Sequence, residues 1–467
     1  MDRKEEMDLI TQVLDSFKVG HGDITVTAGP SVALYEFVPS IGVRMSKIRN
    51  LKDEIAVALK TSGVRVIAPI PGKGTVGIEV PNRERQIVPI ADMLSCDGYR
   101  DTKMQLPLAI GKTVEGNDFI VDLAEMPHLL VAGATGQGKS VGLNVIIASL
   151  LRKKSPDELK LVLVDPKQVE LSVYENIAKP YLAHLSGQPS ICTDPETAQD
   201  TLGAILDLME KRYAMLSKAG VRNISEYNAA SKDKMPYYVI VIDEYGDLIM
   251  TAEDEMEHII CRLAQKARAV GIHMIISTQR PDITVVTGNI KANFPTRIAF
   301  RTTTGTDSRV ILDRIGAERL TGKGDMLFFS GAETTRVQCA YISTEEVNEM
   351  CAEIKKKYGK CNETLLDGRR IPMTEEDVEY ANIAHFKGKC AWVPIPGLLD
   401  IATVIADYEK IGKKEELELQ GRQIILSPSP LILLCKYRVI DSPCVPFNVM
   451  VRDKEKIKRI IDWWSNY

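Results

Sequence analysis

The middle of the chain, from residue 106 to about residue 346, alternates short apolar runs with amphipathic stretches. The apolar runs read HLLVAG, LVLVD, YYVIVID, HMIIST and RIAF in chain order. Because polar residues do not alternate within these runs, they are typical of strands buried on both faces of a parallel sheet, with helices between them. The pattern therefore predicts an α/β fold with a mostly parallel central sheet. Its chemistry should lie in the loops at the carboxyl ends of the strands.

The first 105 residues predict a smaller mixed α/β domain. Apolar residues within 1–20 recur at spacings of one and three, which is typical of one face of a helix. β-Branched and aromatic residues are frequent in 23–39 and 64–81, which indicates strands on either side of a helix at 52–60. No catalytic constellation falls in this region. We interpret it as an adaptor that positions the next domain.

The pattern loosens after Glu346. The following segment, which contains the run GRRIP, is expected to be a connector. The C-terminal region is of unknown type and has a strand-like run, LILLCKYRVI. It is expected to end in a helix with Ile457, Ile460, Ile461 and Trp464 on one face. The expected regions are therefore residues 1–105, 106–346, 347–372 and 373–467.

Composition narrows the class of protein. The 467 residues carry 59 Lys and Arg against 63 Asp and Glu, a formal charge of −4, so the whole molecule is not a polycation that coats nucleic acid indiscriminately. Nine cysteines lie scattered without a CxxC pair and indicate reduced thiols. The N-terminus shows no secretory signal, and no apolar stretch reaches the length of about 20 residues that a membrane-spanning helix needs. We therefore expect a cytoplasmic chain without a membrane segment.

The strongest local motif is GATGQGKS at 133–140, which fits the pattern GxxxxGK[ST]. It follows an apolar strand and precedes a helix-like run, which is the context that a phosphate-binding loop requires. Glycines let backbone N–H groups surround phosphate oxygens, Lys139 neutralises the β- and γ-phosphates, and the Ser140 hydroxyl ligates Mg²⁺. The predicted nucleotide-binding residues are Gly133, Ala134, Thr135, Gly136, Gln137, Gly138, Lys139, Ser140 and Val141.

Two acids end the apolar run at 239–242. Asp243 is expected to hold Mg²⁺ through water, and Glu244 to polarise or deprotonate the water that attacks the γ-phosphate. The alternative, a strand-end carboxylate that only caps the next turn, is disfavoured by the preceding phosphate loop. The sequence therefore predicts an ATP hydrolase that uses ATP and Mg²⁺.

Two further strand ends carry polar residues. Gln279 ends the run MIIST and suits detection of the γ-phosphate, because loss of that phosphate can be passed to the loop that follows. Its alternative role is that of a simple strand cap. For Asp165 and Lys167 two interpretations stay open: the side chains pair with each other, or they line the nucleotide cleft.

Basic residues concentrate in 262–323, where eleven Lys or Arg stand against four acids, a net charge of +7. Beside an NTPase site, such a segment fits contacts with the phosphate backbone of a nucleic acid. These contacts do not depend on sequence and are sensitive to salt. For each single residue the alternative is an ordinary solvated basic face.

Taken together, these motifs resemble the FtsK/SpoIIIE family of double-stranded DNA translocases over about residues 25–346. The likeness is carried by APIPGKGTVGIEVPN, HLLVAGATGQGKSVGLN, LVDPKQVELSVYENI, VIDEYGDL, RLAQKARAVGIHMIISTQRPDITVVTGNIKANFPTRIAF, and DSRVILD followed by GAERLTGKGDML. The resemblance implies a RecA-like motor domain preceded by an adaptor domain. It also implies a homo-hexameric ring that pumps double-stranded DNA, as in chromosome segregation or the transfer of mobile elements.

The same resemblance implies roles for several basic residues. Residues 281–293 would form the pore loop that touches the duplex, with Lys291 and Arg280 as DNA-binding residues. Arg297 or Arg309 would be the arginine finger that completes the site of a neighbouring subunit, and the sequence does not choose between them.

The C-terminal part departs from the family pattern. Full-length members carry membrane helices before the adaptor and end in a winged helix that reads DNA sequence and touches a recombinase, and neither is recognisable here. The partner of the tail, the number of subunits, the basis of directionality and the host process stay open. So does the choice between a trimmed motor and a soluble relative from a mobile element.

Two other functions compete with DNA pumping. One is a conjugation or secretion coupling ATPase, which would move protein or relaxase-linked DNA. The other is a nucleotide-binding scaffold without hydrolysis, which is disfavoured because Lys139, Asp243 and Glu244 are all present.

Overall fold

The chain forms two compact units, residues 1–369 and 370–467, each described here by itself. This computed structural model describes residues 2–367 except 71, 252–253 and 332, and three short strands of the second unit. Those strands form an antiparallel sheet in the order β17-β18-β19, with bounds β17 (Glu416–Leu419), β18 (Arg422–Leu426) and β19 (Cys435–Val439). The strand expected in LILLCKYRVI is thus present in its second half. The expected last helix lies outside the described residues.

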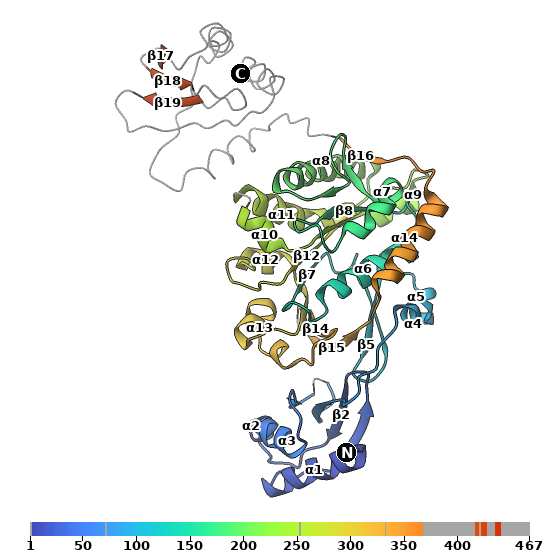
Figure 1. Cartoon of the computed structure of the whole chain (residues 1–467), viewed down its shortest axis with the longest axis vertical. Coiled ribbons are helices and arrows are strands. Elements are labelled where there is room, and N and C mark those ends of the chain that lie inside the picture. The colour runs from blue at the N-terminus through green and yellow to red at the C-terminus, as the bar shows by residue number, and fades with distance from the viewer. Residues whose placement is uncertain are drawn as a thin grey trace. The chain divides into compact units, whose positions relative to one another are not determined.

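An N-terminal domain packs four antiparallel strands, in the order β1-β2-β4-β3, against three helices (Figure 1). Asp2 begins the first helix with a capping box to Glu5, and Ile10 and Leu14 turn its apolar face into the core. The expected opening helix, flanking strands and intervening helix are confirmed. The elements are α1 (Arg3–Ser16), β1 (Thr25–Ala28), β2 (Val32–Phe37), α2 (Met45–Asn50), α3 (Lys52–Ala58), β3 (Arg65–Ile67) and β4 (Val76–Pro81).

A ten-stranded sheet forms the centre of the larger domain, in the order β10-β8-β11-β12-β7-β13-β14-β15-β5-β6. The first six strands are parallel and the last four pair antiparallel. The strands are β5 (Pro107–Thr113), β6 (Asp118–Asp122), β7 (His128–Ala132), β8 (Leu159–Val164), β10 (Ile191–Cys192), β11 (Tyr237–Ile242), β12 (Ile272–Thr278), β13 (Thr296–Phe300), β14 (Asp325–Ser330) and β15 (Thr334–Cys339). All five predicted apolar runs are strands of its parallel half.

Helices cover both faces of this sheet, as the apolar runs predict (Figure 1). Within β8, Leu161 and Leu163 face one core cluster, while Val162 and Val164 face the other. The helices and short segments are α4 (Ile90–Ser95), α5 (Asp97–Arg100), α6 (Lys139–Lys153), η1 (Ser172–Ile177), α7 (Ala178–Tyr181), β9 (Ala183–Leu185), α8 (Pro195–Ala219), α9 (Ile224–Ala230), α10 (Tyr245–Thr251), α11 (Asp254–Lys266), η2 (Ala267–Val270), α12 (Gly288–Asn293), α13 (Gly305–Leu312), η3 (Ala317–Arg319), α14 (Thr344–Tyr358) and β16 (Thr364–Leu366).

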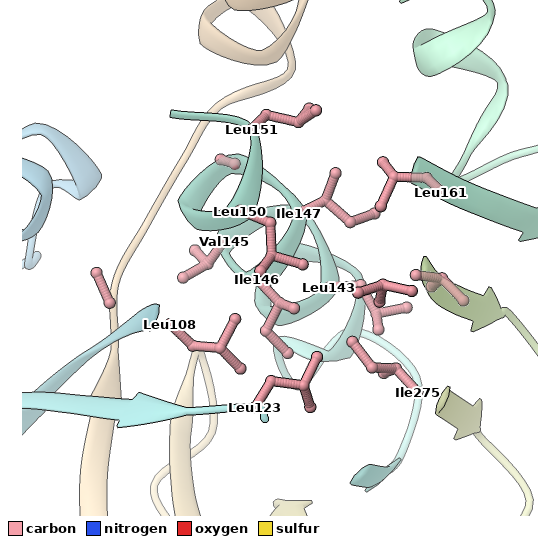
Figure 2. Close-up of a cluster of buried hydrophobic side chains, with 14 of the residues drawn as sticks. Leu108, Leu123, Leu143, Val145, Ile146, Ile147, Leu150, Leu151, Leu161 and Ile275 are labelled. Carbon is pink, nitrogen blue, oxygen red and sulfur yellow. The ribbon is translucent and has the colours of Figure 1, made fainter. Parts of the chain in front are cut away.

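Helix α6, which follows the phosphate loop, is largely buried. Leu143, Ile146 and Ile147 meet side chains of the sheet such as Leu161 and Ile275 (Figure 2). Burying side chains of this size stabilises the fold by about 1.5–3 kcal/mol each. This packing fixes the N-terminus of α6, and with it the loop that comes before the helix.

Residues just outside the expected bounds of the larger domain also pack on its core. Val88, Met93 and Tyr99 belong to the core of the larger domain, so that domain begins before residue 106. At the other end, α14 packs Val347 and Cys351 on the same core. The first part of the expected connector, residues 347–358, therefore belongs to a docked helix. Its apolar positions are sparse, which is why the sequence pattern resembles a loop there.

The adaptor and the larger domain share a buried ion cluster. The Arg336 guanidinium binds both carboxylate oxygens of Asp325, at 3.0 and 2.6 Å, and Glu79 of β4 at 2.6 Å. Burial alone would lower the pKa of Arg336, but the charges of Asp325 and Glu79 outweigh it and raise that pKa. Removing one member of such a cluster leaves a buried charge unpaired, at a cost of about 3–5 kcal/mol.

Candidate nucleotide-binding site

Three neighbouring strand ends form the site. Strand β12 lies between β11 and β7, and all three run parallel. Their carboxyl ends therefore bring the loop 133–140, Gln279 and the pair Asp243-Glu244 to one edge of the sheet. The residues singled out in the sequence as a phosphate loop, a sensor and a metal and water site are thus adjacent in space.

Close backbone packing explains the glycines of the phosphate loop. A Cβ on Gly133 would lie 2.7 Å from Cβ of Phe300, and a Cβ on Gly138 would lie 2.7 Å from the backbone N of Gly324. Gly138 also has φ +118°, a conformation that side chains rarely adopt. It precedes α6 without a side-chain cap, so the first N–H groups of the helix are available to an anion.

Lys139 and Asp243 form a buried pair at the base of the loop. Lys139 Nζ lies 2.5 Å from Asp243 Oδ1 and 3.2 Å from Ser277 Oγ, and the Ser277 hydroxyl donates to the same Asp243 oxygen at 2.7 Å. The second oxygen, Asp243 Oδ2, is buried without a hydrogen-bond partner among the described residues. Such an oxygen fits the role of accepting a hydrogen bond from a metal-bound water.

The donor set around Ser140 fits Mg²⁺ brought in by a nucleotide. The Ser140 hydroxyl donates to Glu170 Oε1, which leaves its lone pairs for a metal, and Asp243 supplies the carboxylate. Within residues 2–367, as far as they are described, no group of three or more acids, histidines or cysteines could cage a metal. Mg²⁺ in nucleotide sites is held in just this sparse way, by one or two protein ligands plus phosphates.

Glu244 is completely buried, and every oxygen of its carboxylate is in use. Oε1 accepts from the Thr278 hydroxyl at 2.9 Å, Oε2 accepts from Lys167 Nζ at 3.2 Å, and the backbone N–H of Gln279 reaches both oxygens at 3.2 Å. Its backbone has φ +48°, which turns the side chain away from that of Asp243.

Gln279 connects the phosphate loop to the segment that follows β12. Its side-chain oxygen accepts from the Thr135 hydroxyl at 2.7 Å. Its backbone N–H binds Glu244, as described above, and Arg280 comes next in the chain. One residue therefore contacts the loop, the buried glutamate and the basic segment.

The side chains of Asp165 and Lys167 have different partners, so only Lys167 follows one of the two open interpretations, that of lining the nucleotide site. The Asp165 carboxylate accepts three backbone N–H groups of its own loop, from Lys167, Glu170 and Leu171. Lys167 Nζ instead pairs with Glu244 at 3.2 Å and with Asp247 at 3.1 Å. Glu170 belongs to the same loop and was not singled out as a site residue in the sequence, although the family-like run LVDPKQVELSVYENI contains it.

The basic segment is partly neutralised within the chain. Arg297 is buried and binds Asp313 at 2.6 Å as well as three backbone carbonyls, and Lys291 binds Asp313 at 2.6 Å. Arg309, on α13, and Arg280 are both exposed. Of the two arginines considered as a finger, Arg309 is the one whose side chain faces solvent.

The strand order and the phosphate loop define a P-loop NTPase domain with a RecA-like sheet. Residues 90–283 match the FtsK/SpoIIIE family, and residues 1–82 match the FtsK alpha domain. These two regions make up more than half of the chain. The protein belongs to the FtsK/SpoIIIE family.

Curated relatives agree with this family. DNA translocase FtsK of Chlorobaculum tepidum is 46% identical over 351 residues, 74% of this chain and 44% of the relative. DNA translocase FtsK of Clostridium tetani is 45% identical over 82% of this chain and 51% of the relative, and DNA translocase SftA of Bacillus subtilis is 43% identical over 76% and 37%. The chain thus spans about half the length of these relatives, or less.

Solved structures share the fold. The pCW3 conjugation coupling protein TcpA, in a monomer form with ATPγS, is 25% identical and has a TM-score of 0.53 over 76% of this chain and 99% of that chain. EssC of Geobacillus thermodenitrificans (ATPases 2 and 3) is 15% identical, with a TM-score of 0.51 over 74% of this chain and 60% of that chain. None of the helices described here is both long and apolar enough to cross a bilayer.

Proposed function

We propose that this chain hydrolyses ATP with Mg²⁺ to move double-stranded DNA through a homo-hexameric ring in the cytoplasm. The observation that carries the proposal is the convergence of Lys139, Asp243-Glu244 and Gln279 at three adjacent strand ends. The family and the curated DNA translocases support double-stranded DNA as the substrate. In this proposal the adaptor domain positions the motor domain.

The site residues take distinct roles in this reaction. The loop 133–141 binds the phosphates, and Lys139 neutralises the negative charge of the β- and γ-phosphates. Ser140 and Asp243 hold Mg²⁺, which neutralises the charge that develops on the phosphate oxygens. Glu244 orients and deprotonates the attacking water, and Gln279 senses the γ-phosphate.

Contacts with DNA come from the segment that follows β12. Arg280 is exposed at its start, and Ile283 is exposed further along. Lys291 would have to exchange Asp313 for a phosphate of the duplex. Because such contacts are electrostatic, binding should be independent of sequence and weaken steeply with salt.

The test is steady-state ATP turnover with linear duplex, single-stranded DNA, unfolded protein or no addition, each with and without Mg²⁺. We expect Mg²⁺-dependent turnover that duplex stimulates most. Lys139→Ala should abolish it. Normal turnover in that variant would show that the loop is not the catalytic phosphate site.

A second function is favoured by one observation, the likeness to a conjugation coupling protein over nearly all of that chain. In that case single-stranded DNA or protein would stimulate turnover more than duplex does. The same assay therefore separates the two functions. The greater identity to DNA translocases favours duplex pumping.

A further inference from the structure

The carboxylate that activates water cannot act in the arrangement described for Glu244, because its oxygens are buried and engaged by three partners. To contact a water molecule it must give up at least one of them. The identity of the partner that releases the Glu244 carboxylate determines what controls hydrolysis. The following inference rests on the proposed function.

The three partners differ in how easily they can leave. Thr278 is buried and belongs to a central strand, and the N–H of Gln279 is part of the backbone at the end of that strand. Lys167, in contrast, is a loop residue with a side chain 39% exposed. A partly exposed ammonium can exchange a carboxylate for water more readily than a buried hydroxyl or a backbone N–H can. Lys167 is therefore the partner that can be released.

The loop that carries Lys167 is well placed to respond to the nucleotide. Asp165 fixes its shape through three backbone hydrogen bonds. At its far end, Glu170 accepts from the hydroxyl of Ser140, the expected metal ligand. The loop thus contacts the metal side of the site through Glu170 and the water side through Lys167.

Lys167 is also held by two acids at once. Its ammonium lies 3.2 Å from Glu244 and 3.1 Å from Asp247, so it joins two acids that follow β11. Desolvation lowers the pKa of Lys167, but the hydrogen bond to Asp247 and the charge of Glu244 outweigh it and raise that pKa. The lysine stays charged at neutral pH and keeps both acids as partners.

We infer that Lys167 is a positioning residue that keeps Glu244 away from the attacking water until DNA and nucleotide are both engaged. Release follows from the geometry of β12. The segment proposed to touch DNA begins directly after Gln279, whose N–H binds both oxygens of Glu244. A shift of this strand end on DNA contact would pull the carboxylate from Lys167, so the lysine sets how strongly turnover depends on DNA.

The experiment compares ATP turnover without DNA and with saturating duplex in the full chain and in Lys167→Met, which keeps the length of the side chain and removes its charge. Turnover without DNA should rise about fivefold, which corresponds to about 1 kcal/mol of barrier. Turnover with duplex should stay near that of the unchanged protein, so the stimulation by duplex falls. Lys167→Arg should restore it, because a guanidinium can pair with the same two acids.

Three controls separate positioning from a general loss of structure. Lys160→Met removes a lysine of β8 that binds the carbonyl of Pro180, away from the site, and should leave both rates unchanged. The melting temperature of Lys167→Met should match that of the unchanged protein. Adding Glu244→Gln to Lys167→Met should remove the extra turnover, because that turnover passes through Glu244.

Two results would contradict this role of Lys167, and a third would contradict the proposed function itself. Unchanged turnover without DNA in Lys167→Met, or an equal fall with and without DNA, would overturn the role of Lys167 while the unchanged protein still hydrolyses ATP on duplex. Absence of Mg²⁺-dependent hydrolysis in the unchanged protein itself would instead overturn the proposed function, and this inference with it.

Discussion

Asp243 and Glu244 are adjacent in the chain and yet belong to different environments. Asp243 continues the direction of β11 and meets Lys139 and Ser277. The left-handed backbone of Glu244, with φ +48°, directs its carboxylate to Thr278 instead. Such a conformation is uncommon outside glycine and is kept only where the surroundings determine it. One strand end thereby carries both the proposed metal ligand and the proposed water-activating carboxylate.

Glu244→Gln should separate ATP binding from hydrolysis. The amide oxygen can still accept from Thr278, but an amide cannot take a proton from water. We expect turnover to fall by at least about 100-fold, the usual contribution of a general base, with unchanged affinity for a fluorescent ATP analogue. Glu175→Gln is the matched control, since Glu175 also accepts from a hydroxyl, that of Ser190, at 2.6 Å. An equal loss of nucleotide affinity would contradict a role in water activation.

Glu170→Ala should weaken the response to Mg²⁺. Without Glu170 the Ser140 hydroxyl loses its acceptor and no longer directs its lone pairs to the metal. Loss of such a supporting contact typically costs about 10–100-fold in metal affinity. The Mg²⁺ concentration that half-saturates binding of a fluorescent ATP analogue should rise by about that factor, whereas Glu175→Ala should leave it unchanged. An unaltered Mg²⁺ titration would mean that Ser140 is oriented by other groups.

At the scale of elements, the sequence predicts where the strands lie in the chain better than it predicts which strands pair with each other. Five apolar runs sufficed to locate β7, β8, β11, β12 and β13, because burial on both faces leaves a local signature. Their order is set by long-range pairing, so nothing local announces that β12 lies between β11 and β7. The antiparallel half of the sheet was not predicted, because its pairing is also set by contacts between residues far apart in the chain.

The candidate site shows the same division. The motif residues could be identified in the sequence, because each stands at the end of an apolar run. The contact of Glu170 with Ser140 and the pairing of Lys167 with Glu244 could not, because they depend on how the loop after β8 folds around Asp165. The burial of Arg297 also depends on a partner distant in sequence, Asp313.

Two buried histidines on neighbouring strands should make the fold sensitive to acid. Nδ1 of His128 accepts the N–H of Met274, and His273 donates to the carbonyl of Pro127. Burial, reinforced by the charge of His273, lowers the pKa of His128 to about 3, and burial lowers that of His273 to about 4 although the Pro127 contact and Asp122 oppose it. Arg268 lowers both pKa values further.

Unfolding raises both pKa values to about 6.5, so the unfolded chain binds more protons between about pH 6.5 and pH 4. As the pH is lowered through this window, the free energy of unfolding should therefore decrease by about 1.4 kcal/mol per pH unit for each histidine. Urea titrations at pH 7.5 and 5.5 check this. His273→Phe, which keeps a ring against Tyr237, should lose about half of the pH dependence. The same slope in that variant would assign the effect to other groups.

At the scale of the whole unit, the phosphate loop is connected to the adaptor. Gly324 donates its N–H to the carbonyl of Gln137 at 2.9 Å and packs against Gly138. Arg85, just after the adaptor, binds the carbonyls of Thr321 and Gly322 at 2.6 and 3.0 Å. Asp325, which follows Gly324 in the chain, belongs to the buried ion cluster that includes Glu79 of the adaptor. A continuous series of contacts therefore joins the phosphate loop to the buried ion cluster at the adaptor.

The exposure of Arg309 makes it the candidate arginine finger between neighbouring subunits of the proposed ring. During hydrolysis negative charge spreads over the γ-phosphoryl oxygens, and a guanidinium from a neighbouring subunit stabilises it. Arg309 on the surface helix α13 can reach out of its own subunit, whereas Arg297 is committed to Asp313 and to backbone carbonyls. The expected donor is Arg309, and the loss of Arg297 should act within its own subunit.

Mixing inactive subunits distinguishes these cases. Arg309→Ala subunits have intact phosphate loops and lack only what they donate, while Lys139→Ala subunits still donate Arg309. Equal mixing should recover up to about a quarter of the turnover, because that fraction of random interfaces combines an intact loop with an intact finger. Arg297→Ala mixed in the same way should recover less, and Arg222→Ala, an exposed arginine elsewhere, should be active alone. No recovery with Arg309→Ala, despite normal assembly by light scattering, would show that catalysis is completed within one subunit or by another arginine.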